Sequence, residues 1–286
     1  MSTANIFTLP LLLCILAVFL FTFTGCLSVE SKFINKTKDE FVKQPLTQEH
    51  LLTESDIEHL PGSVRKYIVY SGAIGKGKVQ NWRATFDAQM IRKPGAAPMT
   101  ALSEQYNFYG NFTRIFLMKA TMFLVPFRAL HIYADQKATF VVRVASLYNV
   151  VNISGQELTS TETVTLLNDM CLLAPGSLAD QRLSWKEIDS LTTRVTIDNG
   201  PYKVSAVLFF NRVGELVNFV SEDRSALQDN GTMKKTKWST PIRDYKDIDG
   251  RRICTYGEAI WNYPEGDFTY GKFTLKDIQY NVRNLQ

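Results

Sequence analysis

Three short polar clusters hold the side chains of this sequence that could take part in chemistry. An aspartate beside an arginine, as in Asp223-Arg224, can orient the polar head group of a ligand. Paired carboxylates could instead carry out acid–base hydrolysis, with Asp169 or Asp223 as the candidate acid. Aspartate and asparagine also cap helices and form turns, which is the structural interpretation of all three clusters. The clusters are Glu162–Cys171, Glu222–Arg224 and Trp238–Tyr245.

Other catalytic and ligand-binding motifs are missing from the sequence. The three histidines are not spaced as metal ligands, and no C-x-x-C pair occurs. There is no G-x-S-x-G motif and no phosphate-binding loop, because the glycine-rich stretch 72–77 lacks the Lys-Ser/Thr ending. We therefore assign no catalytic residue, metal or cofactor, and consider an enzymatic function less favoured than a binding function.

The apolar side chains suggest a ligand pocket more directly. The chain contains 18 Phe, 12 Tyr and 4 Trp, and many Phe and Met lie in residues 112–127. Such side chains can line an adaptable pocket for an acyl chain, and they can equally form an ordinary core. The candidate ligand-binding residues are Phe116, Met118, Met122, Phe123, Phe127, Asn168, Asp169, Met170, Asp223, Arg224, Trp238 and Tyr270.

The N-terminus predicts export and attachment to a membrane. The first 25 residues carry no charge, and the stretch from Ile6 to Thr24 is nearly all apolar. Gly25-Cys26 after this run resembles the lipobox of bacterial lipoproteins, which implies cleavage before Cys26 and a diacylglycerol on its thiol. Phe23 departs from the usual Leu, and no Lys or Arg precedes the run. The alternative is an uncleaved signal anchor, since 19 apolar residues are just long enough to span a bilayer.

The rest of the chain predicts one exported domain on a spacer. Residues 1–25 are the signal peptide or anchor, 26–45 a polar tether, and 46–286 a single β-rich domain that begins with a helical segment. We expect it in the cell envelope, outside the cytoplasm. A net charge of +4 predicts no nucleic-acid partner. Cys171 and Cys254 could form a disulfide or remain buried thiols.

After Gly77 the sequence consists mostly of short runs rich in β-branched and aromatic residues. No long amphipathic helix is evident there, and 168–182 is the best short-helix candidate. The fold class is therefore α+β, mostly β: a large curled antiparallel sheet, or half-barrel, with a few short helices, one of them in its mouth. The expected strands are 79–91, 101–109, 112–119, 130–134, 138–145, 147–153, 161–166, 192–198, 202–210, 215–221, 236–239, 251–261 and 267–282, the last as two strands or one bent strand.

An ordered series of short motifs runs through residues 58–282. The motifs include Leu60-Pro61, Val64–Tyr67, Ser71–Gly75, Glu162–Thr165, Asn168–Cys171, Asp223-Arg224, Trp238–Pro241 and Gly266–Phe268 with Tyr270. This series resembles a bacterial family of uncharacterised proteins, and that resemblance implies no activity and no catalytic residue. The strand-rich tail is more loosely similar to the lipoprotein-localisation-factor fold, which implies a curled sheet holding acyl chains on its concave face.

Three functions remain open from the sequence. The first is a membrane-tethered protein that binds a membrane lipid or another apolar small molecule without catalysis. The second is an envelope hydrolase using Asp169 or Asp223, which predicts a cleft with converging carboxylates. The third is a structural or protein-binding module, which predicts a filled interior. Protein partners cannot be named from the sequence.

Overall fold

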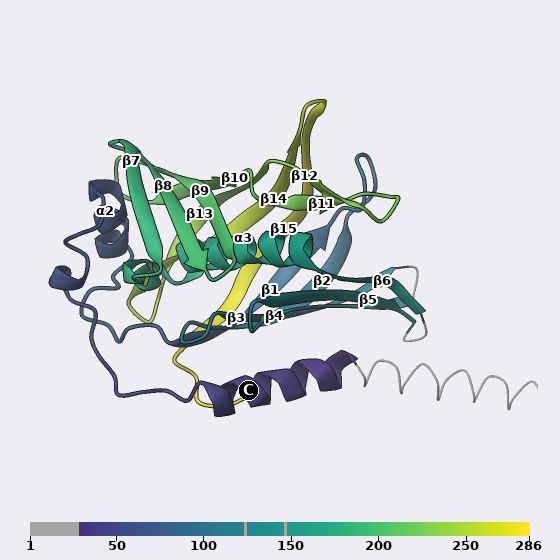
Figure 1. The fold of residues 1–286 in the computed structure, drawn as a ribbon, viewed down its shortest axis with the longest axis horizontal. Coiled ribbons are helices and arrows are strands. Elements are labelled where there is room, and N and C mark those ends of the chain that lie inside the picture. Colours follow the sequence, from purple (N-terminus) through teal and green to yellow (C-terminus); the bar gives the residue numbers. More distant parts are fainter. Residues whose placement is uncertain (1–28, 123–124, 146–147) are drawn as a thin grey trace, which may run out of the picture.

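A computed structural model describes residues 29–122, 125–145 and 148–286 of the chain. In this described part, thirteen strands form one antiparallel sheet in the order β6-β5-β4-β3-β2-β1-β15-β14-β13-β10-β9-β8-β7. The sheet curls around a central helix without closing into a barrel, as Figure 1 shows. Its strands are β1 (Asn81–Met90), β2 (Met99–Phe108), β3 (Thr113–Met122), β4 (Val125–Ala134), β5 (Lys137–Val144), β6 (Tyr148–Ser154), β7 (Leu183–Asp189), β8 (Thr192–Asn199), β9 (Tyr202–Phe210), β10 (Leu216–Ser221), β13 (Trp238–Ile248), β14 (Arg251–Tyr263) and β15 (Gly266–Tyr280).

The helices are few. The longest described ones are an N-terminal helix over residues 29–43 and α3 (Gln156–Leu173), which lies in the concavity of the sheet. No helix in the described residues is both long enough and apolar enough to cross a membrane. The remaining elements are η1 (Glu54–Asp56), α2 (Gly62–Tyr70), η2 (Pro175–Ala179) and the two-stranded ribbon of β11 (Ser225–Leu227) with β12 (Met233–Lys235).

Successive side chains of β2 point to opposite faces of the sheet, which explains how one sheet supports a core on each face. Tyr106 and Phe108 point to the convex face, where they pack with Val29 and Phe33 of the N-terminal helix. Gln105 and Asn107, one residue out of phase, point to the concave face and reach α3. At this part of the sheet, one helix therefore packs on each face.

Helix α3 is buried on every side. All residues from Thr161 to Cys171 are buried, so this part of the helix has no solvent-exposed polar face. For this reason its sequence lacks the apolar periodicity of a surface helix, and its threonines favour a strand by local propensity. The strand expected over 161–166 is wrong, since these residues belong to α3. The helix expected over 168–182 is wrong in its bounds, because α3 ends at Leu173 and η2 follows.

Most expected strands are present, and the expected fold class is confirmed. The run 202–210 coincides with β9, and 267–282 forms one long strand, β15. The prediction missed β7, an edge strand in which Trp185 and Ile188 are separated by two adjacent charged residues. Of the tether expected over 26–45, residues 29–43 are helical instead and pack on the sheet.

The two cysteines of the domain are unpaired. Cys171 on α3 and Cys254 on β14 are both buried free thiols, which confirms the second of the two alternatives. Burial raises the pKa of both thiols, that of Cys254 to about 12. These cysteines therefore behave as small apolar core residues.

Candidate functional site

A cavity of about 1060 Å³ lies between the concave face of the sheet and α3. This volume is at the upper end of the range for small-molecule sites, roughly 300–1,000 Å³. Loops at one end of the sheet surround its mouth, among them Arg92–Pro94 between β1 and β2 and the turn at Glu265 between β14 and β15. The apolar wall includes Phe86, Met90, Phe116, Met118, Phe140, Ile153, Leu158, Leu172, Ile242, Trp261, Phe273 and Leu275.

One cross-strand row of the sheet forms much of this wall. Gln105 on β2 pairs with Phe116 on β3, which pairs with His131 on β4. The row continues through Phe140 on β5 to Ile153 on β6. The His131 ring stacks on Phe140 with a centroid separation of 3.7 Å. Because residues paired across strands share a face, this register brings residues from five strands into one surface.

The inner part of the cavity contains a buried ionic cluster centred on Arg114. Its Nε lies 2.8 Å from Oδ2 of Asp169, and its Nη1 lies 3.3 Å from Oε2 of Glu162. Both acids lie on α3, seven residues apart and therefore about two turns, so one guanidinium contacts them both. The cluster thus joins β3 to the helix in the concavity.

Two amides complete the surroundings of Asp169. Gln105 Nε2 and Asn107 Nδ2 donate to Asp169 Oδ2 at 2.6 and 3.1 Å. Gln105 Oε1 in turn accepts a hydrogen bond of 3.2 Å from Arg114. This carboxylate is therefore held in a fixed orientation by three donors from β2 and β3.

A second buried arginine, Arg224, lies among aromatic rings on the opposite part of the wall. Its guanidinium carbon is 4.1 Å from the ring centroid of Trp238 and 5.3 Å from that of Trp261. Tyr270 accepts hydrogen bonds from Arg224 Nη1 at 3.3 Å and from Trp238 Nε1 at 3.1 Å. Arg224 Nη2 also lies 3.7 Å from Oε1 of Glu162, which links this group to the ionic cluster.

Two nitrogen atoms of the cavity wall have no hydrogen-bond partner among the described residues. They are Nε of Arg224 and Nδ1 of His131, both buried. His131 Nδ1 is 3.7 Å from Oε1 of Glu162, which is too long for a hydrogen bond. An unpaired buried donor is costly, so an acceptor atom supplied by a ligand would stabilise this wall.

The protonation of the cluster follows from burial and charge. Burial lowers the pKa of His131 to about 4, although the charge of Glu162 acts in the opposite direction. Burial also raises the pKa of the Glu162 carboxyl, but His131, Arg114 and Arg224 outweigh it and leave this pKa below its ordinary value. For Asp169 burial prevails over Arg114, and its pKa lies above the ordinary value. In the described residues no group of three His, Cys, Asp or Glu side chains could hold a metal ion.

The structure brings together seven of the twelve candidate residues. Met170 lies in the core, and Phe127 packs on a small cluster beside the cavity lining. Asp223 accepts a hydrogen bond from the Ser205 backbone and pairs with Lys235, so it does not converge with Asp169. Met122 ends β3, while Phe123 and the expected lipid-anchor residue Cys26 lie outside the described residues. The seven cavity-lining residues are Phe116, Met118, Asn168, Asp169, Arg224, Trp238 and Tyr270.

Several polar residues of the site were not predicted from the sequence. Arg114 and Gln105 were overlooked, and neither Glu162 nor His131 was chosen as a site residue, although both line the cavity. The available signal was a polar residue on the inward face of an otherwise apolar strand. On β3, Arg114 shares that face with Phe116 and Met118, and a charge there must find a buried partner.

The chain is similar in fold to several solved structures of low sequence identity. A DUF1329 family protein from Desulfovibrio piger has 11% identity and a TM-score of 0.42, covering 87% of this chain and 93% of that chain. A LolA superfamily protein from Nitrosomonas europaea has 9% identity and a TM-score of 0.41, covering 82% and 93%. A putative outer membrane lipoprotein-sorting protein domain from Vibrio parahaemolyticus has 7% identity and a TM-score of 0.36, covering 70% and 85%. At these values the likeness concerns the fold alone.

No curated protein matches the chain. A family model does match it, over residues 50–273, and this range is more than half of the chain. The match confirms the expected membership of a group of uncharacterised proteins. The chain belongs to the family described as "Family of unknown function (DUF6544)".

Proposed function

We propose that this protein binds a lipid or another apolar small molecule in the cavity of its curled sheet, without catalysis. The observation that carries the proposal is the cavity itself: about 1060 Å³, walled by Phe, Met, Leu and Trp side chains. A core that served only stability would be filled, because protein interiors pack densely and voids are destabilising. Transfer of a ligand chain into this space contributes ~0.8 kcal/mol per buried CH₂ group.

The polar end of the cavity supports a ligand with an oxygen-bearing head. Arg224 offers an unpaired buried Nε and is held by its contacts with Trp238 and Tyr270. An oxygen acceptor placed there would satisfy this donor while the tail contacts the apolar wall. The proposed ligand is therefore amphiphilic, with a long apolar portion and an oxygen-containing head.

The N-terminal sequence supports attachment of the domain to a membrane outside the cytoplasm. Cys26 is the proposed lipid-anchor residue, and an uncleaved apolar helix is the alternative. The mass of the mature N-terminus decides between them. A diacylglyceryl mass that disappears in Cys26→Ala supports the lipid anchor, and an intact Met1 without lipid contradicts it.

The binding function is tested by ligand extraction and by uptake of a fluorescent acyl probe. We expect solvent extracts of the purified full chain to contain a lipid, identified by mass spectrometry, and the delipidated protein to take up the probe saturably. Ala259→Phe adds bulk to the cavity wall and should abolish uptake. Val213→Phe, at an exposed turn far from the cavity, is the control and should bind as the wild type does. No extracted lipid and no saturable uptake would refute the proposal.

One observation favours a hydrolytic function as the second candidate. Glu162 and Asp169 both contact Arg114, and their pKa values are displaced in opposite directions. Two carboxyl groups whose pKa values are displaced in opposite directions can act as base and acid. Turnover of an ester of the bound lipid class by the wild type, and its loss in Asp169→Asn, would support hydrolysis over simple binding.

A further inference from the structure

The mouth of the cavity and several hairpin tips lie at one end of the sheet. The register of the ladder places the β1–β2 loop, which lines the mouth, at the same end as the β3–β4 turn. Met90 pairs with Met99, and Met122 pairs with Val125 at that end. We call this the mouth end. The turn between β2 and β3, around Asn111, lies at the opposite end.

The N-terminal helix starts at the mouth end and runs away from it. Glu30, in its first turn, lies 3.1 Å from Lys119 and 3.2 Å from Arg128. Lys119 on β3 pairs with Arg128 on β4. They lie three residues from Met122 and Val125, which form the last pair before the β3–β4 turn at the mouth end. At the other end of the helix, the side chain of Gln44 accepts a hydrogen bond of 2.7 Å from the Asn111 backbone. The helix is therefore antiparallel to β3, as Figure 1 also shows.

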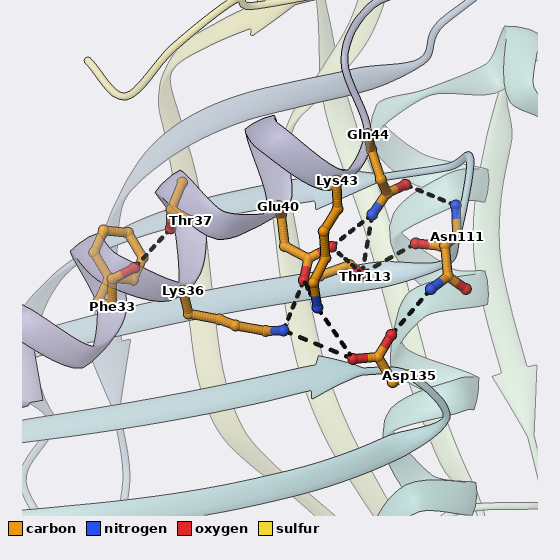
Figure 2. A network of polar contacts seen from close by, with 9 residues as sticks. All are labelled: Phe33, Lys36, Thr37, Glu40, Lys43, Gln44, Asn111, Thr113 and Asp135. Atoms are coloured by element: carbon orange, nitrogen blue, oxygen red, sulfur yellow. Dashed lines mark hydrogen bonds and ion pairs between the residues drawn. The ribbon is translucent and has the colours of Figure 1, made fainter.

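The helix is held rigidly on the convex face of the sheet. Glu40 is fully buried, with Oε1 2.6 Å from Lys36 Nζ, while Oε2 accepts a hydrogen bond of 2.7 Å from Gln44 and one of 3.3 Å from Thr113. Figure 2 shows this network between the helix and the sheet, extended by the pair of Lys43 and Asp135. A helix fixed by both apolar packing and a buried carboxylate gives the preceding chain one defined point of exit.

The chain before Val29 is the most apolar part of the sequence. Four residues, 25–28, separate the apolar run from Val29, and even fully extended they reach only about 14 Å. The described surface at the mouth end also exposes apolar side chains: Tyr148 is 72% exposed, Val150 58% and Leu227 40%. A membrane that holds either the apolar run or a lipid on Cys26 must therefore lie close to the mouth end.

We propose that the mouth end of the sheet rests on the surface of a lipid bilayer, so that the cavity opens directly onto the membrane. The N-terminal helix sets this orientation by directing the anchor toward that end. The inference rests on the proposed membrane attachment and lipid binding, and it adds the route of the ligand: from bilayer to cavity without passage through water. Energetically this route avoids exposing the apolar tail to solvent.

Two valines of nearly equal exposure allow a matched test. Val150 at the mouth end is 58% exposed, and Val213, in the β9–β10 turn beside α2, is 61% exposed. Each is changed to Cys in a full chain carrying Cys14→Ser, labelled with a fluorophore and reconstituted in vesicles whose lipids carry a nitroxide quencher. Cys171 and Cys254 are buried and leave little background. Tyr148→Cys serves as a second position at the mouth end.

We expect labels at 150 and 148 to lose most of their fluorescence in the quencher vesicles, and the label at 213 to keep it. Equal quenching at both ends, stronger quenching at 213, or no quenching anywhere would overturn the proposed orientation. The same samples are assayed for extracted lipid. Bound lipid without the quenching pattern refutes the orientation alone, and the quenching pattern without bound lipid refutes the binding function alone.

Discussion

The Nε atom of Arg114 lies 2.8 Å from Oδ2 of Asp169, and this contact ties the inner wall of the sheet to the helix in its concavity. The same guanidinium reaches Glu162 at 3.3 Å. Bulk water does not solvate either carboxylate, because Glu162 and Asp169 are both buried. Arg114 therefore compensates two buried negative charges at once.

Replacing Arg114 with Ala should lower the free energy of unfolding by about 3–5 kcal/mol, since both acids lose their main partner within the interior. Urea unfolding at pH 7 measures this change. The control is Arg83→Ala, on β1 of the same sheet, whose partners Glu104 and Asp277 are partly exposed. That variant should cost only ~1 kcal/mol or less. Equal losses in the two variants would contradict the assigned role of Arg114.

His131 should make the protein less stable in mild acid. Burial lowers its folded-state pKa to about 4 from the ordinary value of 6.5, so the unfolded chain takes up this proton first as the pH falls. The contribution of His131 to stability is complete above pH 6.5 and is lost progressively down to about pH 4. At ~1.4 kcal/mol per pH unit, the loss approaches about 3 kcal/mol.

The pH effect is measured as the difference between wild type and His131→Gln. The contribution of Glu162 to the free energy of unfolding is lost only in more acidic solution, because its folded-state pKa is lowered. The pKa of Asp169 is raised, so its contribution to the free energy of unfolding changes in the opposite direction as the pH falls. The wild type should therefore lose more unfolding free energy than His131→Gln between pH 6.5 and 4.5. Parallel pH profiles for the two proteins would show that His131 is not the titrating group.

Much of the sheet could be predicted because its strands alternate. On β9, Val204, Ala206 and Leu208 face the core, and this period of two is legible in the sequence. The sequence of α3 shows no amphipathic pattern, because a helix that is buried on all sides has no solvent-exposed polar face. The N-terminal helix did have a readable face, with buried positions at 29, 33, 37 and 40, but its many charged residues resemble those of a spacer.

The site could be predicted only in part, for a different reason. Arg224, Trp238 and Tyr270 were recognised as individual residues, yet their mutual contact depends on the curl of the sheet. Arg114 is 48 residues from Glu162 and 55 from Asp169 in the chain. Local sequence cannot reveal such a pairing, because it arises from the register of β3 and the position of α3 together.

Glu40 should control the attachment of the N-terminal helix. In Glu40→Ala, the side chains of Lys36, Gln44 and Thr113 lose a shared buried acceptor, which costs about 1–3 kcal/mol. Amide hydrogen exchange over residues 29–43 should then become at least about tenfold faster, while exchange in β14 and β15 stays unchanged. The adjacent exposed acid provides the control, since Asp39→Ala removes a carboxylate from the solvent side of the same helix. Acceleration in both variants, or in neither, would contradict the role given to Glu40.

Arg224 should distinguish ligands by their head group. Its guanidinium lines the cavity and has an unpaired Nε, and a hydrogen bond to a charged group contributes about 1.5–3 kcal/mol. Arg224→Gln should therefore weaken binding of a carboxylate-headed acyl probe by roughly 10- to 100-fold, as measured by fluorescence titration. For a hydrocarbon probe of the same length the effect should be small, because burial of the tail does not involve the guanidinium. Arg252→Gln, which removes an exposed arginine stacked on Tyr70 outside the cavity, should change neither affinity. If both probes lost affinity equally in Arg224→Gln, the arginine would be supporting the shape of the cavity through Trp238, and the head group would bind elsewhere.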